Sequence, residues 1–257
     1  MFLTLKSANS HMMVSDSYQD FAARYDWMIS DDPVRKAFFQ QLFKSHNVSN
    51  VLDCACGTGA DLLMFHDLGY KVVGSDLSEA MLDQAQTRLQ KAGVDLPIQK
   101  ADFRQLEQYS SEKFDSVVCL TNAINEVLDE SGVRAALKSM RSMLRPGGIL
   151  IFDQGQSDLM MREKPRFEPV LNNRDYSRVF ALEYSGQVMR VNVLDLIHDG
   201  LKNEFYASKF DIAIRLKDDW DRLLDGIGFS DIQYYGDYEF NDYDKESSHM
   251  LLVVARN

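Results

Sequence analysis

Hydrophobic residues follow one repeated rhythm over roughly the first 150 positions: a short apolar run, then a segment with helical spacing. The first such run, Val51–Ala55, leads through Gly57-Thr58-Gly59 into a helical pattern that extends to Leu68. The remaining units are strands at Lys71–Ser75, Ile98–Ala101, Ser116–Leu120 and Ile149–Phe152, and helices at Glu79–Ala92 and Val133–Met143. Because strands that alternate with helices pair in parallel, these five strands predict a doubly wound α/β sheet.

The rhythm changes after Asp153. Three longer segments of alternating character, Tyr176–Tyr184, Val188–Ile197 and Phe205–Ile214, predict an antiparallel meander. A helix at Asp218–Ile227 and strands at Ile232–Tyr238 and His249–Ala255 then resume the first pattern, which raises the expected sheet to seven strands. At the other end, Tyr18–Phe43 predicts two amphipathic helices that are interrupted around Ser30–Pro33.

These patterns predict one core domain with an inserted subdomain. We expect residues 18–154 and 216–257 to form the core with its N-terminal helices, and residues 155–215 to form a β cap inserted after the fifth strand. Residues 1–17 are expected to be a leader or disordered, and residues 1–12 have the look of an expression leader.

Composition and charge restrict the classes of partner. The 257 residues are 45% hydrophobic and 26% charged, which is typical of a globular chain. Lys and Arg number 28 against 39 Asp and Glu, and the resulting charge of −11 opposes approach to nucleic acid or to an anionic membrane. We therefore expect a small-molecule substrate, no nucleic acid and no membrane partner, whereas the sequence leaves the oligomeric state open.

The cysteines favour a reducing compartment. Cys54, Cys56 and Cys119 are odd in number and lie in apolar stretches, so they do not form a disulfide framework. Since no Cys or His cluster completes a coordination set, we expect no metal site. There is no apolar stretch of the length that a membrane span requires and no signal peptide pattern, so we expect a cytoplasmic location.

The turn after the first strand is the first candidate binding feature. Gly57 and Gly59 let a ligand approach bare backbone at the start of a helix, where unpaired N–H groups carry partial positive charge. The dinucleotide fingerprint needs a third small residue where this chain has Leu62, so a pyrophosphate is disfavoured. Asp53, four residues before Gly57, is placed to hold an ammonium group, which suits an amino-acid-like ligand.

Two later acids indicate an adenosine. Asp76 ends the second strand, where this type of fold places the carboxylate that binds the ribose hydroxyls. After the third strand, Asp102 can accept from an exocyclic amine, and the adjacent Phe103 can cover a purine face. Leu77 and Met81 are expected to add apolar cover on the other side of the same pocket.

Together these residues resemble the motifs of class I S-adenosylmethionine-dependent methyltransferases. The similarity rests on four segments in order: Val51–Gly59, Gly74–Ser78, Ala101-Asp102 and Leu144–Gly148. It implies a Rossmann-like sheet that binds S-adenosylmethionine, with Gly57 and Gly59 near the methionine part, Asp76 on the ribose and Asp102 on the adenine. The predicted cofactor site comprises Tyr25, Asp53, Ala55, Gly57, Gly59, Asp76, Leu77, Met81, Ala101, Asp102, Phe103 and Leu120.

Within that class the chain is most similar to glycine and sarcosine N-methyltransferases. The similarity lies in the glycine-loop motif, in Thr121-Asn122-Ala123-Ile124, in the β cap and in Tyr25, which matches that group's N-terminal tyrosine near the cofactor. One departure concerns the substrate, because Gly155 stands where glycine-type enzymes carry an arginine for the substrate carboxylate. The candidates to replace that arginine lie in the cap: Arg166, Arg174, Arg178 and Arg190.

The chemistry asks little of the protein beyond alignment and a deprotonated acceptor, because the sulfonium methyl is already activated. Asn122, Asn125 and Glu126 are expected to line the transfer site, and we take Asn122, Asn125 and Tyr25 as candidate catalytic residues. The prediction is transfer to the nitrogen of a small amine. The alternatives are an oxygen or sulfur acceptor, a non-catalytic S-adenosylmethionine-binding module, and an NAD-linked oxidoreductase, which Leu62 disfavours.

Overall fold

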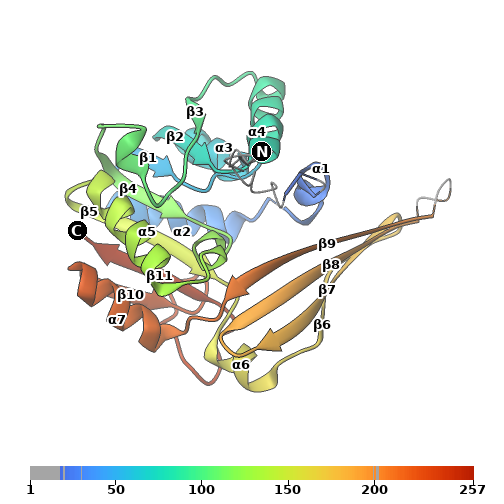
Figure 1. The fold of residues 1–257 in the computed structure, drawn as a ribbon. Helices are drawn as coiled ribbons and strands as arrows, with labels where there is room; N and C mark the ends of the chain where they lie inside the picture. Colours follow the sequence, from blue (N-terminus) through green and yellow to red (C-terminus); the bar gives the residue numbers. More distant parts are fainter. Residues whose placement is uncertain (1–17, 20, 30, 199, 201–202) are drawn as a thin grey trace, which may run out of the picture.

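The structure is a computed structural model that describes residues 18–19, 21–29, 31–198, 200 and 203–257, so the expected leader lies outside the described residues. Two sheets organise these residues (Figure 1). The larger is a mixed sheet of seven strands in the order β10-β11-β5-β4-β1-β2-β3. Its strands are β1 (Asn50–Asp53), β2 (Lys71–Asp76), β3 (Ile98–Lys100), β4 (Phe114–Cys119), β5 (Leu144–Gln154), β10 (Ser230–Tyr235) and β11 (Leu251–Arg256).

The five strands β1 to β5 are parallel, and β11 pairs antiparallel with both β5 and β10. Helices cover both faces, and the described helices of this core are α2 (Pro33–Ser45), α3 (Ala60–Asp67), α4 (Glu79–Ala92), α5 (Glu130–Met143) and α7 (Lys217–Ile227). This arrangement confirms the predicted fold, a doubly wound α/β sheet with an antiparallel β cap after the fifth strand.

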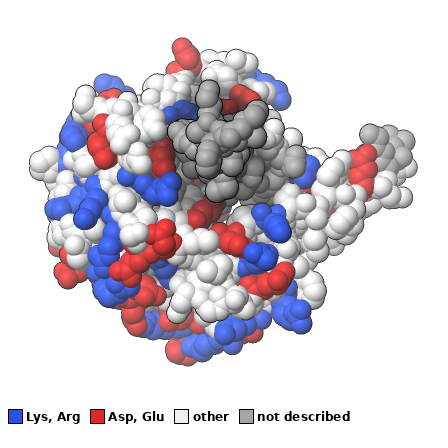
Figure 2. All heavy atoms as spheres, viewed as in Figure 1, with Lys and Arg blue, Asp and Glu red and all other residues white. Residues whose placement is uncertain are grey.

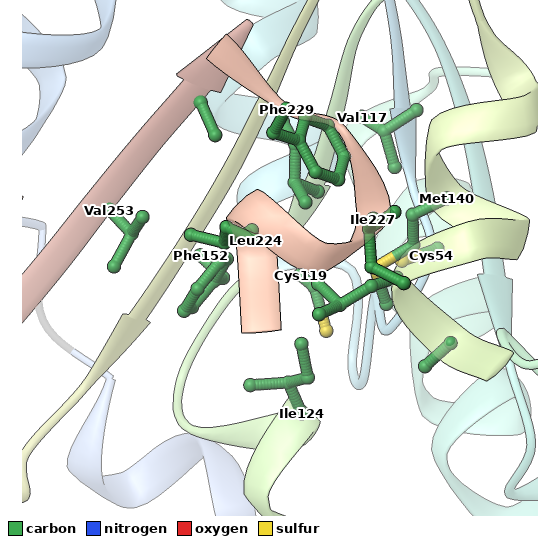
Figure 3. Close-up of a cluster of buried hydrophobic side chains, with 14 of the residues drawn as sticks. Cys54, Val117, Cys119, Ile124, Met140, Phe152, Leu224, Ile227, Phe229 and Val253 are labelled. Carbon is green, nitrogen blue, oxygen red and sulfur yellow. The ribbon is translucent and has the colours of Figure 1, made fainter. Parts of the chain in front are cut away.

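The central strands read as continuous apolar runs because both of their faces are buried. Leu150 and Phe152 of β5 pack with α5 and α7, whereas Ile149 and Ile151 pack with α2 and α3. Strand β11 alternates in the same way, with Val253 on the first face (Figure 3). The sheet is thus held between two hydrophobic layers, and the carboxyl ends of its parallel strands are left at one edge for polar residues.

The second sheet is the cap, and Figure 1 shows it projecting away from the core. It contains β6 (Phe167–Asn172), β7 (Tyr176–Ser185), β8 (Val188–Ile197) and β9 (Glu204–Ala213), in sequential antiparallel order. A short helix, α6 (Asp158–Glu163), precedes it. The sequence patterns did not predict α6 or β6. Strand β6 is an edge strand interrupted at Pro169, which cannot donate to a ladder, so it lacks the alternation of a central strand.

The N-terminal segment is less helical than predicted. The first expected helix is a single turn, α1 (Ala22–Tyr25), followed by the 3₁₀ turn η1 (Asp26–Met28). Two more 3₁₀ turns, η2 (Leu106–Gln108) and η3 (Ala123–Glu126), follow β3 and β4. At the far end of the chain, β10 stops at Tyr235 instead of continuing to Tyr238, because the chain turns back at Gly236. None of the helices in the described part of the chain is long and apolar enough to span a bilayer.

A buried ion pair joins the N-terminal segment to the cap. The Arg178 guanidinium, which is inaccessible to solvent, donates to both carboxylate oxygens of Asp195 at 2.7 and 3.0 Å. Arg24 adds a third hydrogen bond to Asp195 at 3.0 Å, and Arg178 also donates to the backbone carbonyl of Arg24. Because these charges are compensated and hydrogen-bonded, they are tolerated in the interior and fix α1 against β7 and β8.

We expect Asp195→Asn to lower the free energy of unfolding by about 3–5 kcal/mol, because it leaves Arg178 buried without a counterion. Asp211→Asn is the matched control, since Asp211 forms the same fork with Arg190 on the same sheet but with both side chains partly exposed. That change is expected to cost less than about 1 kcal/mol. Urea unfolding measures both, and equal losses in the two variants would contradict the role given to the buried pair.

Candidate functional site

A cavity of about 430 Å³ lies where the strand ends of the core meet the N-terminal segment and the cap. Most of its polar lining comes from the core and the N-terminal segment, with Gln156 and Glu168 from the cap, and its apolar lining comes mostly from the cap. The residues that line it are Tyr18, Phe21, Tyr25, Met28, Arg35, Thr121, Asn122, Glu126, Asp153, Gln154, Gly155, Gln156, Met160, Glu168, Phe180, Leu182, Met189, Val191, Phe210, Ile212, Tyr238 and Met250. Of the residues predicted for the cofactor or transfer site, Tyr25, Asn122 and Glu126 are in this lining.

The glycine loop after β1 lies beside Asp76. The Asp76 carboxylate accepts from the backbone N–H of Gly57 at 2.8 Å and from that of Ser78 at 2.9 Å. Gly57 and Gly59 have φ values of +51° and +79°, the left-handed region that favours glycine. A Cβ built on Gly57 would meet nothing within 4 Å, so the loop has open space above it. The acid and the open loop therefore fit a ribose lying across the end of β2.

Asp53 is almost fully buried at the end of β1, and its Oδ1 accepts from the Ala55 N–H at 3.2 Å. Burial raises the pKa of the Asp53 carboxyl well above its usual range, and the nearby Asp61 acts in the same direction. A cationic ammonium group would compensate this charge. The Asp53 carboxylate at the end of β1 thus fits the ammonium group in the amino-acid part of S-adenosylmethionine.

Asp102, the residue predicted to bind the adenine, is already paired with another side chain of the protein. Both oxygens of Asp102 accept from the Arg104 guanidinium, at 3.0 Å from Nε and 2.6 Å from Nη2. Burial alone would raise the pKa of Asp102, but the hydrogen bonds from Arg104 lower it. Leu77 is 56% exposed, an uncovered apolar side chain beside Asp76 of the kind a purine would cover.

Four other predicted cofactor residues pack into the core. Met81, Ala101 and Leu120 are each at most 3% exposed, and Phe103 packs against the hydrophobic layer under α5. The Ala101 N–H donates to the carbonyl of Asp76, which ties β3 to the end of β2. In this structure these side chains support the ends of the strands.

The turn after β4 is strained and anchored by Asp153. Thr121 and Asn122 have φ values of +57° and +69°, and a β-branched residue in this region is a genuine outlier that costs about 1–3 kcal/mol. Asp153 holds the turn, because its carboxylate accepts from the Thr121 N–H and its carbonyl accepts from the Asn122 N–H. Such strain is common at functional sites, and here it turns Asn122 toward the cavity.

Asn125 lies behind the cavity wall in a buried amide network. Its Nδ2 donates to Asn122 and Gln154, both at 2.9 Å, and its Oδ1 accepts from Arg215 at 3.3 Å. Gln154 also accepts from the Trp220 indole at 2.8 Å. Asn125 is therefore not part of the described cavity lining, although the sequence analysis places it among the catalytic candidates.

Glu126 faces the cavity at the end of η3, and the Tyr18 hydroxyl donates to its carboxylate. Burial raises the pKa of the Glu126 carboxyl to about 7, and Asp76 acts in the same direction, while the hydrogen bond from Tyr18 opposes the shift. Burial likewise raises the pKa of Tyr25, so this tyrosine keeps its proton at neutral pH. The cavity thus holds a carboxyl group able to exchange a proton near pH 7.

Arg35 is a cavity residue that the sequence analysis missed. It comes from the first turn of α2 and forms a two-point pair with the Asp61 carboxylate, with Nη2 2.9 Å from Oδ2. Its charge also lowers the pKa of the nearby Asp53 and Asp153 carboxyls, in both of which burial is the larger effect. Its spacing in α2 is that of an ordinary amphipathic helix, so nothing in the sequence marks it out.

The cap arginines proposed from the sequence do not line the cavity. Arg178 is committed to Asp195, and Arg190 to Asp211. Arg174 is 96% exposed at a turn, and Arg166 is exposed before β6. No group of three or more potential metal ligands occurs among the residues that the structure describes, and the three cysteines are buried free thiols.

The N-terminal segment also bonds to the core, close to the glycine loop. The Asp26 carboxylate accepts from the Thr58 hydroxyl at 2.5 Å and pairs with Arg88 of α4 at 2.6 Å. Together with the bond from Arg24 to Asp195, this links the glycine loop to the cap through residues 24–26 of the N-terminal segment. Tyr25 lies between the two attachments, which explains why it reaches the cavity.

Comparison with known proteins shows which proteins this chain is similar to. A family model described as "Methyltransferase domain" matches residues 51–148. A glycine/sarcosine N-methyltransferase from Aphanothece halophytica is 28% identical over 256 residues, covering 94% of this chain and 92% of its own length.

Solved structures agree on the fold. A S-adenosylmethionine-dependent methyltransferase from Clostridium acetobutylicum ATCC 824 has a TM-score of 0.78 at 18% identity, covering 93% of this chain and 98% of its own. The amino pentose methyltransferase CalS10 from Micromonospora echinaspora has a TM-score of 0.74 at 22% identity, covering 93% and 97%.

We expect Asp76→Ala to weaken binding of S-adenosylhomocysteine, the product form of the cofactor, by about 1–3 kcal/mol in calorimetry. Asp76→Ala could weaken binding by removing the ribose contact or by loosening the loop at Gly57. The 2′-deoxy analogue of S-adenosylhomocysteine, which lacks one ribose hydroxyl, distinguishes these two effects. It is expected to bind the wild-type protein less tightly, with no further loss in the variant. Asp83→Ala, an exposed acid on α4, is the control, and an unchanged affinity in Asp76→Ala would refute the ribose assignment.

Proposed function

We propose that this chain, which is a class I S-adenosylmethionine-dependent methyltransferase, methylates the nitrogen of a small-molecule amine. The observation that carries the choice of nitrogen is Glu126, a buried carboxyl group that faces the cavity. An amine reaches the site mainly as an ammonium ion, which a carboxylate attracts and which must lose a proton before it can react. The relatives' names, glycine/sarcosine N-methyltransferase, are in keeping with nitrogen as the acceptor.

In the proposed reaction, Glu126 takes one proton from the bound ammonium and so frees the nitrogen lone pair. S-adenosylmethionine supplies a methyl group already activated on a sulfonium. The nitrogen forms the new N–C bond as the C–S bond breaks with its electron pair remaining on sulfur, so a neutral thioether leaves. The chain contributes alignment and a place for the proton, and no covalent nucleophile is needed.

The proposed roles of the other residues follow their positions. Asp53 and the glycine loop would hold the methionine part, and Asp76 the ribose, with Leu77 and Asp102 toward the adenine. Tyr25 and Asn122, which both line the cavity, would contact the reacting groups. We assign Asn125 to positioning, because its hydrogen bonds hold Asn122 and Gln154 in place.

We keep the predicted division into a core of residues 18–154 and 216–257 and a substrate-binding cap of residues 155–215. The acidic composition and the mixed charges on the face drawn in Figure 2 support a small-molecule acceptor, with no nucleic acid or membrane partner. Buried free thiols support a reducing, cytoplasmic location.

A test of the reaction class measures transfer of a labelled methyl group from S-adenosylmethionine to panels of small amines, phenols and thiols. We expect turnover with amines and at most background transfer to the other two panels. Binding of S-adenosylhomocysteine is followed in parallel to show that the site is intact. Transfer confined to phenols or thiols would exclude the nitrogen assignment while leaving the methyltransferase class in place.

We expect kcat/KM to rise with pH through about pH 7, because the carboxylate form of Glu126 is populated above its pKa. Other titrating groups close to Glu126 are Tyr18, Tyr25 and Asp76, and the two tyrosines titrate well above this range. In Glu126→Gln, the rise of kcat/KM near pH 7 is expected to disappear. The rise at higher pH, which comes from deprotonation of the amine substrate itself, is expected to remain. An identical profile in the variant would show that another group titrates.

A further inference from the structure

The cap presents an apolar face to the cavity. The inward-facing side chains come from three neighbouring strands, with Phe180 and Leu182 on β7, Met189 and Val191 on β8, and Ile212 on β9. They form one hydrophobic cluster with Phe21 of the N-terminal segment, to which Met160 of α6 adds. A face of this kind recognises hydrocarbon and gains nothing from a small polar ligand.

The cavity is also larger than a minimal amino acid requires. Its volume of about 430 Å³ is equivalent to roughly fourteen water molecules at about 30 Å³ each. Glycine has five heavy atoms, so it would leave most of the apolar face facing water. An acceptor with a hydrocarbon body would instead cover that face.

Charge in the cavity is unfavourable for a carboxylate ligand. Three acids line it, Glu126, Asp153 and Glu168, and Arg35 is the basic residue among the described lining. Arg35 is already paired through both of its terminal nitrogens with Asp61. Gly155 adds no side chain, and a Cβ built there would meet nothing within 4 Å. Among the described lining residues, a substrate carboxylate would therefore lose its hydration without gaining an unpaired cation.

We propose that the methyl acceptor is a primary or secondary amine with a hydrocarbon body and no carboxylate, its nitrogen at Glu126 and its body against the apolar face of the cap. This inference rests on the proposed function and narrows its substrate class. Two parts of the cavity lining account for the two halves of the specificity. Glu126 selects the cation, and the face around Phe180 and Leu182 selects the body.

The experiment compares matched pairs that differ by one carboxylate: 2-phenylethylamine against phenylalanine and 3-methylbutylamine against leucine, with glycine and sarcosine alongside. Methyl transfer and calorimetric binding to the complex with S-adenosylhomocysteine are both measured. We expect the carboxylate-free member of each pair to be favoured roughly 100-fold in kcat/KM and to bind more tightly, because it leaves no charged group unpaired.

Two variants separate the halves of the site. Glu126→Gln keeps the size of the side chain and removes its charge, so it should weaken amine binding about tenfold or more. Phe180→Ala should lower kcat/KM for 2-phenylethylamine roughly tenfold by removing part of the wall. Phe205→Ala is the matched control, because Phe205 is an exposed aromatic of the same sheet outside the cavity lining. S-adenosylhomocysteine should bind equally well to all three variants.

The outcomes distinguish this inference from the proposed function. Glycine or sarcosine turning over as well as, or better than, the carboxylate-free amines would overturn the inference and leave N-methylation standing. Transfer to phenols or thiols alone would overturn both. Neither binding nor turnover with any carboxylate-free amine, in a protein that binds S-adenosylhomocysteine, would also overturn the inference. Preference for the carboxylate-free amines with equal effects of Phe180→Ala and Phe205→Ala would reject the assignment of the cap face.

Discussion

A buried network of amide and guanidinium groups connects the cap to the core, and the geometry of the cavity depends on it. The chain leaves the core after Gln154 and returns at Arg215, and the Gln154 side chain donates to the Arg215 carbonyl at 2.7 Å. The Arg215 guanidinium in turn donates to the Val127 carbonyl at 2.7 Å, close to Glu126. Because buried polar groups are costly unless all of them are paired, this network admits few alternative arrangements. It sets the cap and the turn after β4 in one fixed relation.

The N-terminal segment closes the same cavity from a third direction, and two charged attachments hold it there. Asp26 bonds to the glycine loop through Thr58 and to α4 through Arg88, while Arg24 bonds to the cap through Asp195. The cavity is thus made by three stretches of chain that are far apart in sequence. In the proposed site, the N-terminal segment would contact both the acceptor and the cofactor, so a change in this segment would affect the binding of both.

Several carboxyl groups are buried at or near the cavity. Asp53, Glu126 and Asp153 all have carboxyl pKa values that burial raises. Asp53 and Asp153 lie at the ends of β1 and β5, and Glu126 ends the turn η3 that follows β4. Such concentration of like charge disfavours the unliganded protein and favours cationic ligands. S-adenosylmethionine, with its sulfonium and ammonium groups, and the proposed amine acceptor are both cations, so the same buried acids would favour both.

The sequence by itself determined the parts whose signals are local. Strand and helix periodicity predicted the seven-stranded sheet and the cap, and the spacing of Asp53, Gly57, Gly59 and Asp76 predicted a nucleoside site at adjacent strand ends. Strand β6 was not predicted, because an edge strand interrupted at Pro169 lacks the alternation of hydrophobic and polar residues. Glu126 was expected at the transfer site from the sequence, but only the tertiary structure brought Arg35 and Phe180 to the same cavity, because helix α2, the turn after β4 and the cap converge there. Only the tertiary structure shows that Asn125 lies behind the cavity wall. The direction of its side chain depends on packing and on the left-handed backbone of Thr121 and Asn122, and residue type does not determine it.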